Sequence, residues 1–181
     1  MKHRQLAIGI AAGALLSTAV VGFAHADCRH VDGRINSDLV AFFSDGSACP
    51  SPLGLCTEGR FSGDLKGRFR FVADSLSPYV LQDPASPADV VATTGTISLR
   101  TKYCGGTLFL RDTSAFSTSA DGLVGGLETV DGDASSGGCA GASGRIHVAG
   151  VFMEGCINCR YEGEVCRVGG GADDDSDSED D

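Results

Sequence analysis

Cys156 and Cys159 have the spacing of a redox dithiol or of half a zinc site. A redox pair of this kind normally opens a helix in an alternating strand–helix context, which does not surround it here. A zinc site needs a second pair at similar spacing, but Cys49 and Cys56 are seven positions apart. We therefore interpret Cys156 and Cys159 as a disulfide that ties a turn, and we expect no metal and no cofactor.

Histidines and paired carboxylates are the other side chains that could do acid–base chemistry. A histidine base needs a nucleophile beside it, and the sequence places none beside His30 or His147. His147 alternates with the outward-facing residues of its strand and should face solvent. Glu162 and Glu164 occupy alternating positions of a later strand and should also face solvent. The catalytic residues therefore stay unknown at this stage.

The acidic run at 131–135 resembles the start of a calcium-binding loop. Such a loop has glycine at its sixth position and an acid at its twelfth. Ser136 and Ala142 occupy these positions here. We interpret the run as a solvated turn.

The first 26 residues have the features of a signal peptide. Lys2, His3 and Arg4 form a positively charged start, and the apolar run Leu6–Val21 follows it. Ala24–Ala26 then has the small–any–small pattern of a cleavage site. A membrane anchor is the alternative, but the apolar run is short for a span of about 20 residues. We expect a secreted or periplasmic protein that begins at Asp27 and has no membrane span.

Eight cysteines follow the predicted cleavage site, which suggests a disulfide framework in an exported chain. They are Cys28, Cys49, Cys56, Cys104, Cys139, Cys156, Cys159 and Cys166. Free or metal-binding thiols are the alternative, but thiols seldom stay reduced outside the cytosol.

The chain is acidic, with a net charge of −10. Seven acidic residues lie in the segment 173–181, which follows a glycine run at 169–171. Such a segment cannot bury apolar surface, so we predict that 169–181 is a disordered acidic tail. Nucleic acids and anionic membranes would repel an acidic protein, so neither is an expected partner.

Short alternating segments and 26 glycines indicate an all-β fold. We expect strands within the ranges 39–43, 65–73, 90–101, 123–130, 145–152 and 159–165. A further strand, which contains Leu108 and Leu110, should follow a tight turn at Gly105 and Gly106. The proline-containing segment 75–88 reads as a loop. We predict a small closed antiparallel β-barrel over 55–168, preceded by a cysteine-tied entry segment over 27–54. A β-sandwich is the alternative that composition leaves open.

Several pieces of sequence resemble secreted bacterial proteins with a barrel of the allene oxide cyclase and dirigent type. The matching pieces are CPSPLGLCTEG at 49–59, GDLKGRFRF at 63–71, GTLFLRD at 106–112, GGCAGASGRI at 137–146 and GEVC at 163–166. The resemblance implies a calycin-like barrel and export. That secreted group has no established activity, and no site residue of the named enzymes aligns with this chain.

Three functions are compatible with this interpretation. A small barrel can hold one small apolar ligand if its interior is not filled. An isomerase or cyclase acting on a lipid-derived substrate follows from superfamily analogy alone. A cell-envelope interaction protein is the third. The predicted core could also fill the interior; it consists of Phe69, Phe71, Ile97, Leu99, Ile146 and Phe152. The oligomeric state stays open.

The predicted topology also suggests how the cysteines pair. The first and last strands of an up-and-down barrel are neighbours. If the first strand begins near Cys56, then Cys56 should pair with Cys166. Cys28 would pair with Cys49 in the entry segment, and Cys156 with Cys159. Cys104 and Cys139 then remain by elimination.

Overall fold

The computed structural model describes residues 26–79, 90–117, 122–152 and 156–168, and within them the chain is all-β. The strands are β1 (Ala26–Leu39), β2 (Cys56–Gly63), β3 (Gly67–Tyr79), β4 (Val90–Thr101), β5 (Gly106–Ser117), β6 (Leu123–Val130), β7 (Ser136–Gly137), β8 (Ser143–Phe152) and β9 (Cys156–Val168). No helix in these ranges is long and apolar enough to cross a membrane. The predicted leader and acidic tail lie outside the described residues.

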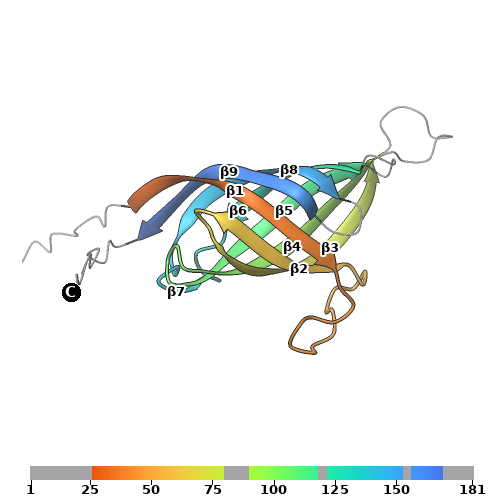
Figure 1. Ribbon diagram of the computed structural model, residues 1–181, viewed down its shortest axis with the longest axis horizontal. Coiled ribbons are helices and arrows are strands. Elements are labelled where there is room, and N and C mark those ends of the chain that lie inside the picture. The colour runs from red at the N-terminus through yellow and green to blue at the C-terminus, as the bar shows by residue number, and fades with distance from the viewer. Residues whose placement is uncertain (1–25, 80–89, 118–121, 153–155, 169–181) are drawn as a thin grey trace, which may run out of the picture.

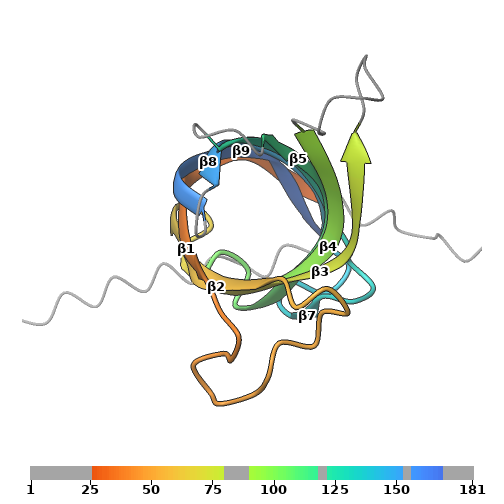
Figure 2. The ribbon, with the colours of Figure 1, turned by 90° about the vertical axis from the view of Figure 1, so that its right-hand side faces the viewer.

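Eight of these strands form one closed antiparallel barrel (Figures 1 and 2). The order around it is β4, β3, β2, β1, β9, β8, β6 and β5, and pairing of β4 with β5 closes the ring. The two-residue strand β7 adds to the end of β5. The prediction of a small closed antiparallel β-barrel is confirmed.

The barrel begins earlier than the sequence indicated. Ala26–Leu39 forms β1, a full barrel strand that pairs with β2 on one side and with β9 on the other. The predicted entry segment 27–54 is therefore wrong for its first half, and only the part after Leu39 is a loop. Gly33 and several charged residues interrupt the apolar alternation of β1, which is why its strand pattern is weak.

The earlier first strand changes the disulfide pairing. Cys28 and Cys166 are register partners on β1 and β9 and form a disulfide. Cys49 pairs with Cys56, so the predicted pairings Cys56–Cys166 and Cys28–Cys49 are both wrong. A disulfide does join the first and last strands, but the first strand is β1, which contains Cys28, rather than a strand that begins near Cys56.

The second half of the disulfide framework agrees better with prediction. Cys104 and Cys139 form a disulfide, as predicted by elimination. Cys159 is buried and disulfide-bonded. The side chain of Cys156 lies outside the described part of the structure, so the pairing of Cys156 with Cys159 stays a prediction.

Two other sequence-based boundaries also differ. The strand β3 continues to Tyr79 after an irregularity in its pairing at Ala73 and Ser75, so the predicted loop 75–88 starts too early. The apolar run 39–43 is not a strand of its own, because β1 ends at Leu39 and Phe42 makes only an isolated bridge to Ala48.

Strict alternation along the strands produces the core. Phe69, Ile97, Leu99 and Ile146 are buried, as predicted, and Phe71 is half-buried. The side chain of Phe152 lies outside the described residues. Other large side chains that are almost completely buried are Val31, Phe61, Leu65, Leu108, Leu110, Tyr161 and Val165.

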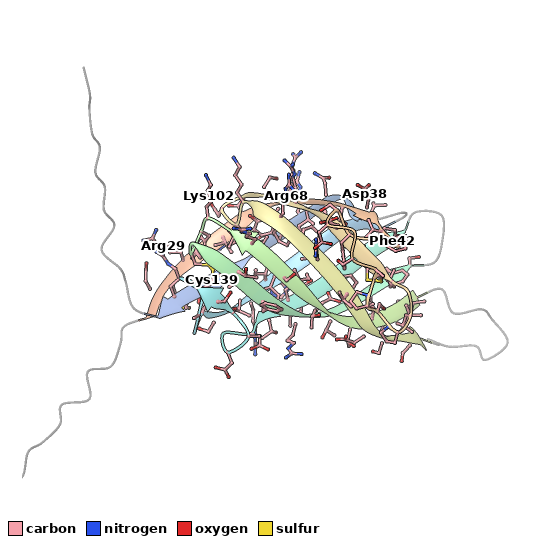
Figure 3. The ribbon with its side chains drawn as sticks, turned by 90° about the horizontal axis from the view of Figure 1, so that it is seen from below. Arg29, Asp38, Phe42, Arg68, Lys102 and Cys139 are labelled. Carbon is pink, nitrogen blue, oxygen red and sulfur yellow. A yellow bond between two sulfur atoms is a disulfide. The ribbon has the colours of Figure 1, made fainter. Side chains whose placement is uncertain are left out.

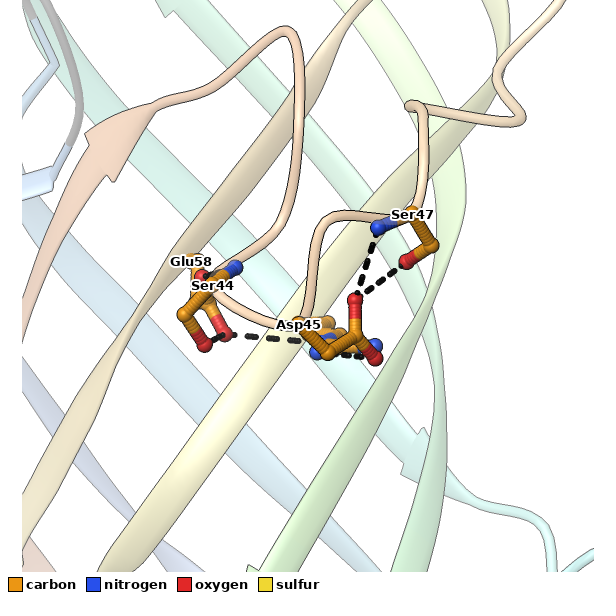
Figure 4. A network of polar contacts seen from close by, with 5 residues as sticks. Ser44, Asp45, Ser47 and Glu58 are labelled. Atoms are coloured by element: carbon orange, nitrogen blue, oxygen red, sulfur yellow. Dashed lines mark hydrogen bonds and ion pairs between the residues drawn. The ribbon is translucent and has the colours of Figure 1, made fainter.

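A polar network holds the loop between β1 and β2 against the barrel wall (Figure 4). Arg70 on β3 contacts Asp45 at 2.8 Å and Glu58 at 3.4 Å, and its guanidinium lies 4.5 Å from the centre of the Phe43 ring. Hydrogen bonds from Ser47, followed by the Arg70 contact, hold the pKa of Asp45 well below its usual range. Together with Cys49–Cys56, this network fixes the loop.

Candidate functional site

Part of the barrel interior is not filled by side chains. A cavity of about 80 Å³ lies between β1, β2, β3, β4, β5, β6 and β8. Its apolar lining consists of Ile35, Phe61, Phe69, Phe71, Ile97, Val124 and Val148, and its polar lining of Ser37, Thr57, Asp112, Ser114 and Glu128. The cavity is therefore mainly apolar, with two carboxyl groups on one wall.

The two carboxyl groups are Asp112 on β5 and Glu128 on β6. They are direct register partners across the two strands, and both point inward. Their exposed fractions are 6% for Asp112 and 3% for Glu128. Ser114 donates a hydrogen bond of 3.0 Å from its hydroxyl to Oδ2 of Asp112. Glu128 Oε2 is buried and has no hydrogen-bond partner among the described residues.

Burial determines the protonation of this carboxyl pair. Loss of hydration raises the pKa of Glu128 far above its usual value, and the nearby charge of Asp112 and their shared hydrogen bond raise it further. Burial also raises the pKa of Asp112, while hydrogen bonds from Glu128 and Ser114 oppose that rise. Both shifts favour a pair that holds one proton between the two groups, with Glu128 as donor and Asp112 as acceptor.

Glycines make room for the pair. A side chain at Gly126 would place its Cβ 2.8 Å from Cβ of Ser114. Gly95 pairs with Asp112 across β4 and β5, and a Cβ at this position would clash with the Phe71 ring. Glycine at these two positions lets Ser114 and Phe71 pack beside the carboxyl pair. The glycines that weakened the strand pattern of β6 thus have a packing role.

A buried carboxyl pair that shares a proton can do two things. It can bind a polar group of a ligand, because Oε2 of Glu128 offers an unused acceptor. It can also move a proton, because one group is protonated and the other is not.

The residues considered from sequence lie elsewhere. His30, His147, Glu162 and Glu164 are exposed on the outer face of β1, β8 and β9, as expected for His147 and the two glutamates. Strand pairing places His30 opposite Glu164 and His147 opposite Glu162. They line an open outer surface rather than an enclosed site.

Two further groups are structural. Asp131 accepts a hydrogen bond from the amide of Ala134 and contacts Arg111 at 2.8 Å, so the run 131–135 is a solvated turn as predicted. Cys28, Glu164 and Cys166 come together like metal ligands, but both sulfurs belong to one disulfide. That disulfide leaves Glu164 as the only available ligand of the three.

The carboxyl pair was missed in the sequence, although the signal was present. Leu108 and Leu110 share the inward face of β5, and Asp112 is the next residue of the same parity. Glu128 has the parity of Val130, which is buried. An acid at an inward position of each of two neighbouring strands is the feature that would have identified the site.

Comparisons with known proteins identify no relative: no protein-family model, no curated protein and no solved structure gives a significant match to this chain.

Proposed function

We propose that the barrel interior binds one small, mainly apolar molecule that donates a hydrogen bond to Glu128. The observation that carries this proposal is Oε2 of Glu128, a buried acceptor to which no residue in the described part of the chain donates, in a cavity lined mostly by apolar side chains. Buried polar atoms are almost always hydrogen-bonded, so an unused one indicates a missing donor. A hydroxyl or ammonium group on the ligand would supply that donor.

The cavity limits the size of this ligand. Sites for drug-sized molecules measure roughly 300–1,000 Å³. The cavity lined by the described residues is about 80 Å³, which suits a molecule of a few non-hydrogen atoms. The pair carries one negative charge when it shares a proton, so a small amine is favoured over a neutral alcohol.

Proton transfer is a second candidate function. A protonated and an ionised carboxyl group side by side form a general acid and a general base, as an isomerase or cyclase requires. The observation that supports proton transfer is the proton that Asp112 and Glu128 share. The resemblance to the allene oxide cyclase and dirigent type of barrel agrees with this candidate. An interaction with the cell envelope is a third candidate function, and it would not make use of the cavity.

We further propose that the protein acts outside the cytoplasm. Three described disulfides are compatible with an oxidising compartment. The leader pattern in residues 1–26 supports export. Amino-terminal sequencing of exported protein should begin at Asp27, and a start at Met1 would contradict export by cleavage.

The binding proposal is tested by native mass spectrometry of protein purified from its own host. We expect a retained small molecule in the unaltered protein. Glu128→Met removes the acceptor oxygen and should lower the occupancy by about tenfold, as expected for one lost hydrogen bond. Glu162→Met, on the outer face of β9, is the matched control and should retain the ligand. Absence of a bound molecule, or equal retention in both variants, would contradict the proposal.

The same material separates binding from catalysis. A binding protein releases the molecule unchanged, whereas an isomerase or cyclase releases a mixture of the molecule and an isomer of equal mass. Chromatography of the extract distinguishes the two. A single species that the protein does not convert on prolonged incubation would exclude the catalytic candidate.

A further inference from the structure

Three arginines form one row across the outside of the barrel. Strand pairing places Arg60 on β2 opposite Arg68 on β3, and Arg68 opposite Arg100 on β4. All three side chains are exposed. Neighbouring strands lie about 4.8 Å apart, so three positive charges follow one another at this spacing. We call these three residues the arginine row.

The arginine row has no acidic partner among the described residues. None of the ion pairs there involves Arg60, Arg68 or Arg100. The adjacent row on the same face is different, because Arg70 has both Asp45 and Glu58. Like charges placed directly opposite each other destabilise a sheet. The arginine row therefore carries a cost that a nearby anion would remove.

Two lysines extend the row toward one end of the barrel. Lys66 and Lys102 lie in the turns that join β2 to β3 and β4 to β5, and the amide of Lys102 lies 3.5 Å from the carbonyl oxygen of Lys66. Both lysines line the same outer groove as the arginine row. Figure 3 shows Lys102 and Arg68 projecting from one side of the barrel. Among the described residues, Asp38 is the one acidic residue that lines this groove, so the five cations leave the face positive on a chain whose net charge is −10.

The chain leaves the barrel beside this face. Near the end of β9, Arg167 lies 5.4 Å from the centre of the Tyr103 ring, and its Nη1 donates a hydrogen bond of 3.4 Å to the Tyr103 carbonyl. Tyr103 directly follows Lys102. The acidic segment begins at Asp173, five residues beyond Val168, and five extended residues reach about 17 Å. The positive face is thus within reach of the acidic segment.

We propose that the acidic segment 173–181 binds to the arginine row of the same molecule. Its seven carboxylates match a face with five unpaired cations, and the point where β9 ends brings the two together. Guanidinium groups hold carboxylates by paired hydrogen bonds, so each arginine can hold one acid. Exposed ion pairs add little stability, so this contact should contribute little to the free energy of unfolding.

The test is carbodiimide cross-linking of the full chain, which joins carboxylates to nearby lysine amines. Peptide mapping should find residues 173–181 joined to Lys66 or Lys102. Arg60→Gln, Arg68→Gln and Arg100→Gln together should lower this yield by about tenfold, as expected for three lost exposed charge contacts. The matched control replaces Arg111, Arg145 and Arg160 by Gln, which removes equal charge elsewhere and should leave the yield unchanged.

Three outcomes would overturn the proposal. The first is absence of these cross-links at low salt. The second is an equal yield in the two triple variants. The third appears in a mixture of light and isotopically heavy protein: links between light and heavy chains would show that the segment binds a second molecule.

A second measurement does not depend on the arginine variants. Replacing the seven acids of 173–181 by amides keeps the full chain and frees the arginine row. Inorganic tripolyphosphate should then bind about tenfold more tightly than to the unaltered protein, measured by calorimetry at low salt. Equal affinity of the two proteins would overturn the proposal.

Discussion

Asp112 on β5 and Glu128 on β6 face each other directly inside the barrel, and their carboxyl groups share a hydrogen bond. Both side chains are almost completely buried. The folded protein therefore binds a proton at this pair more tightly than the unfolded chain does. This difference in proton binding makes folding stability depend on pH.

The first prediction concerns this pH dependence. The pKa of Glu128 in the folded protein lies well above the usual value of 4.5. As the pH rises, Glu128 loses its proton in the unfolded chain before it does so in the folded protein. The contribution of this proton to the free energy of unfolding is therefore fully present below the usual pKa and is lost as the pH rises through the folded pKa. Stability should fall by at most about 1.4 kcal/mol per pH unit for each such group.

Urea unfolding between pH 5 and pH 8 measures this effect, and Glu128→Gln should remove most of the decline. Glu162→Gln is the control, because Glu162 is exposed on the outer face. Parallel stability curves for the unaltered protein and Glu128→Gln would show that the pair carries no shifted proton.

The second prediction concerns two neighbouring glycines of β6. A Cβ at Gly126 would lie 2.8 Å from Cβ of Ser114, whereas a Cβ at Gly125 would meet nothing closer than 4.0 Å. Gly126→Ala should destabilise the barrel by about 1–3 kcal/mol through overpacking and should reduce ligand binding. Gly125→Ala should be neutral or stabilising by up to about 1 kcal/mol. Equal changes in thermal unfolding would refute the packing role of Gly126.

The fold could be predicted from sequence where alternation is clean. In β3 and β4, aromatic and aliphatic residues alternate with arginine and serine, and Phe69, Ile97 and Leu99 are buried as expected. β1 was not predicted as a barrel strand, because Gly33 and several charged residues interrupt the alternation of its apolar residues. Gly33 is required there: a Cβ would lie 2.6 Å from the Tyr161 hydroxyl. This close contact between β1 and β9 exists only in the closed barrel, so no pattern in the sequence of β1 alone predicts it.

The candidate site was predictable in part. Residue parity alone places Asp112 and Glu128 on the inward faces of β5 and β6. Their direct opposition depends on the register of the two strands, which the sequence does not specify. The cavity depends on side chains from seven strands, so its existence and volume follow only from the complete packing.

The third prediction concerns the disulfide Cys28–Cys166, which joins the first and last strands at a sequence separation of 138. In the chain-entropy model such a loop contributes about 5 kcal/mol, whereas the Cys49–Cys56 loop contributes about 2 kcal/mol. Replacing Cys28 and Cys166 by serine should therefore lower the melting temperature more than replacing Cys49 and Cys56. Non-reducing peptide mapping should recover Cys28 linked to Cys166. A peptide that links Cys56 to Cys166 would contradict the register of β1.

The fourth prediction concerns Tyr161, a buried residue of β9 whose hydroxyl joins two parts of the barrel. The hydroxyl accepts a hydrogen bond of 2.9 Å from the Leu65 amide and donates one of 3.0 Å to the Ser62 carbonyl. Its ring crosses over Gly33 to reach the turn between β2 and β3. Tyr161→Phe removes only one oxygen atom, but it leaves the buried Leu65 amide without a partner, which costs about 1–3 kcal/mol.

Tyr103→Phe is the matched control for this change. The Tyr103 hydroxyl makes one hydrogen bond, of 3.1 Å to the Val165 carbonyl, and Tyr103 is only half-buried. Water can therefore replace its partner, and the loss should stay near the lower end of the range for a single hydrogen bond, about 0.5 kcal/mol. Chemical unfolding of both variants measures the difference. If Tyr161→Phe costs no more than Tyr103→Phe, the Tyr161 hydroxyl does not hold the β2–β3 turn, and packing of its ring against Phe61, with ring centres 5.1 Å apart, accounts for its burial.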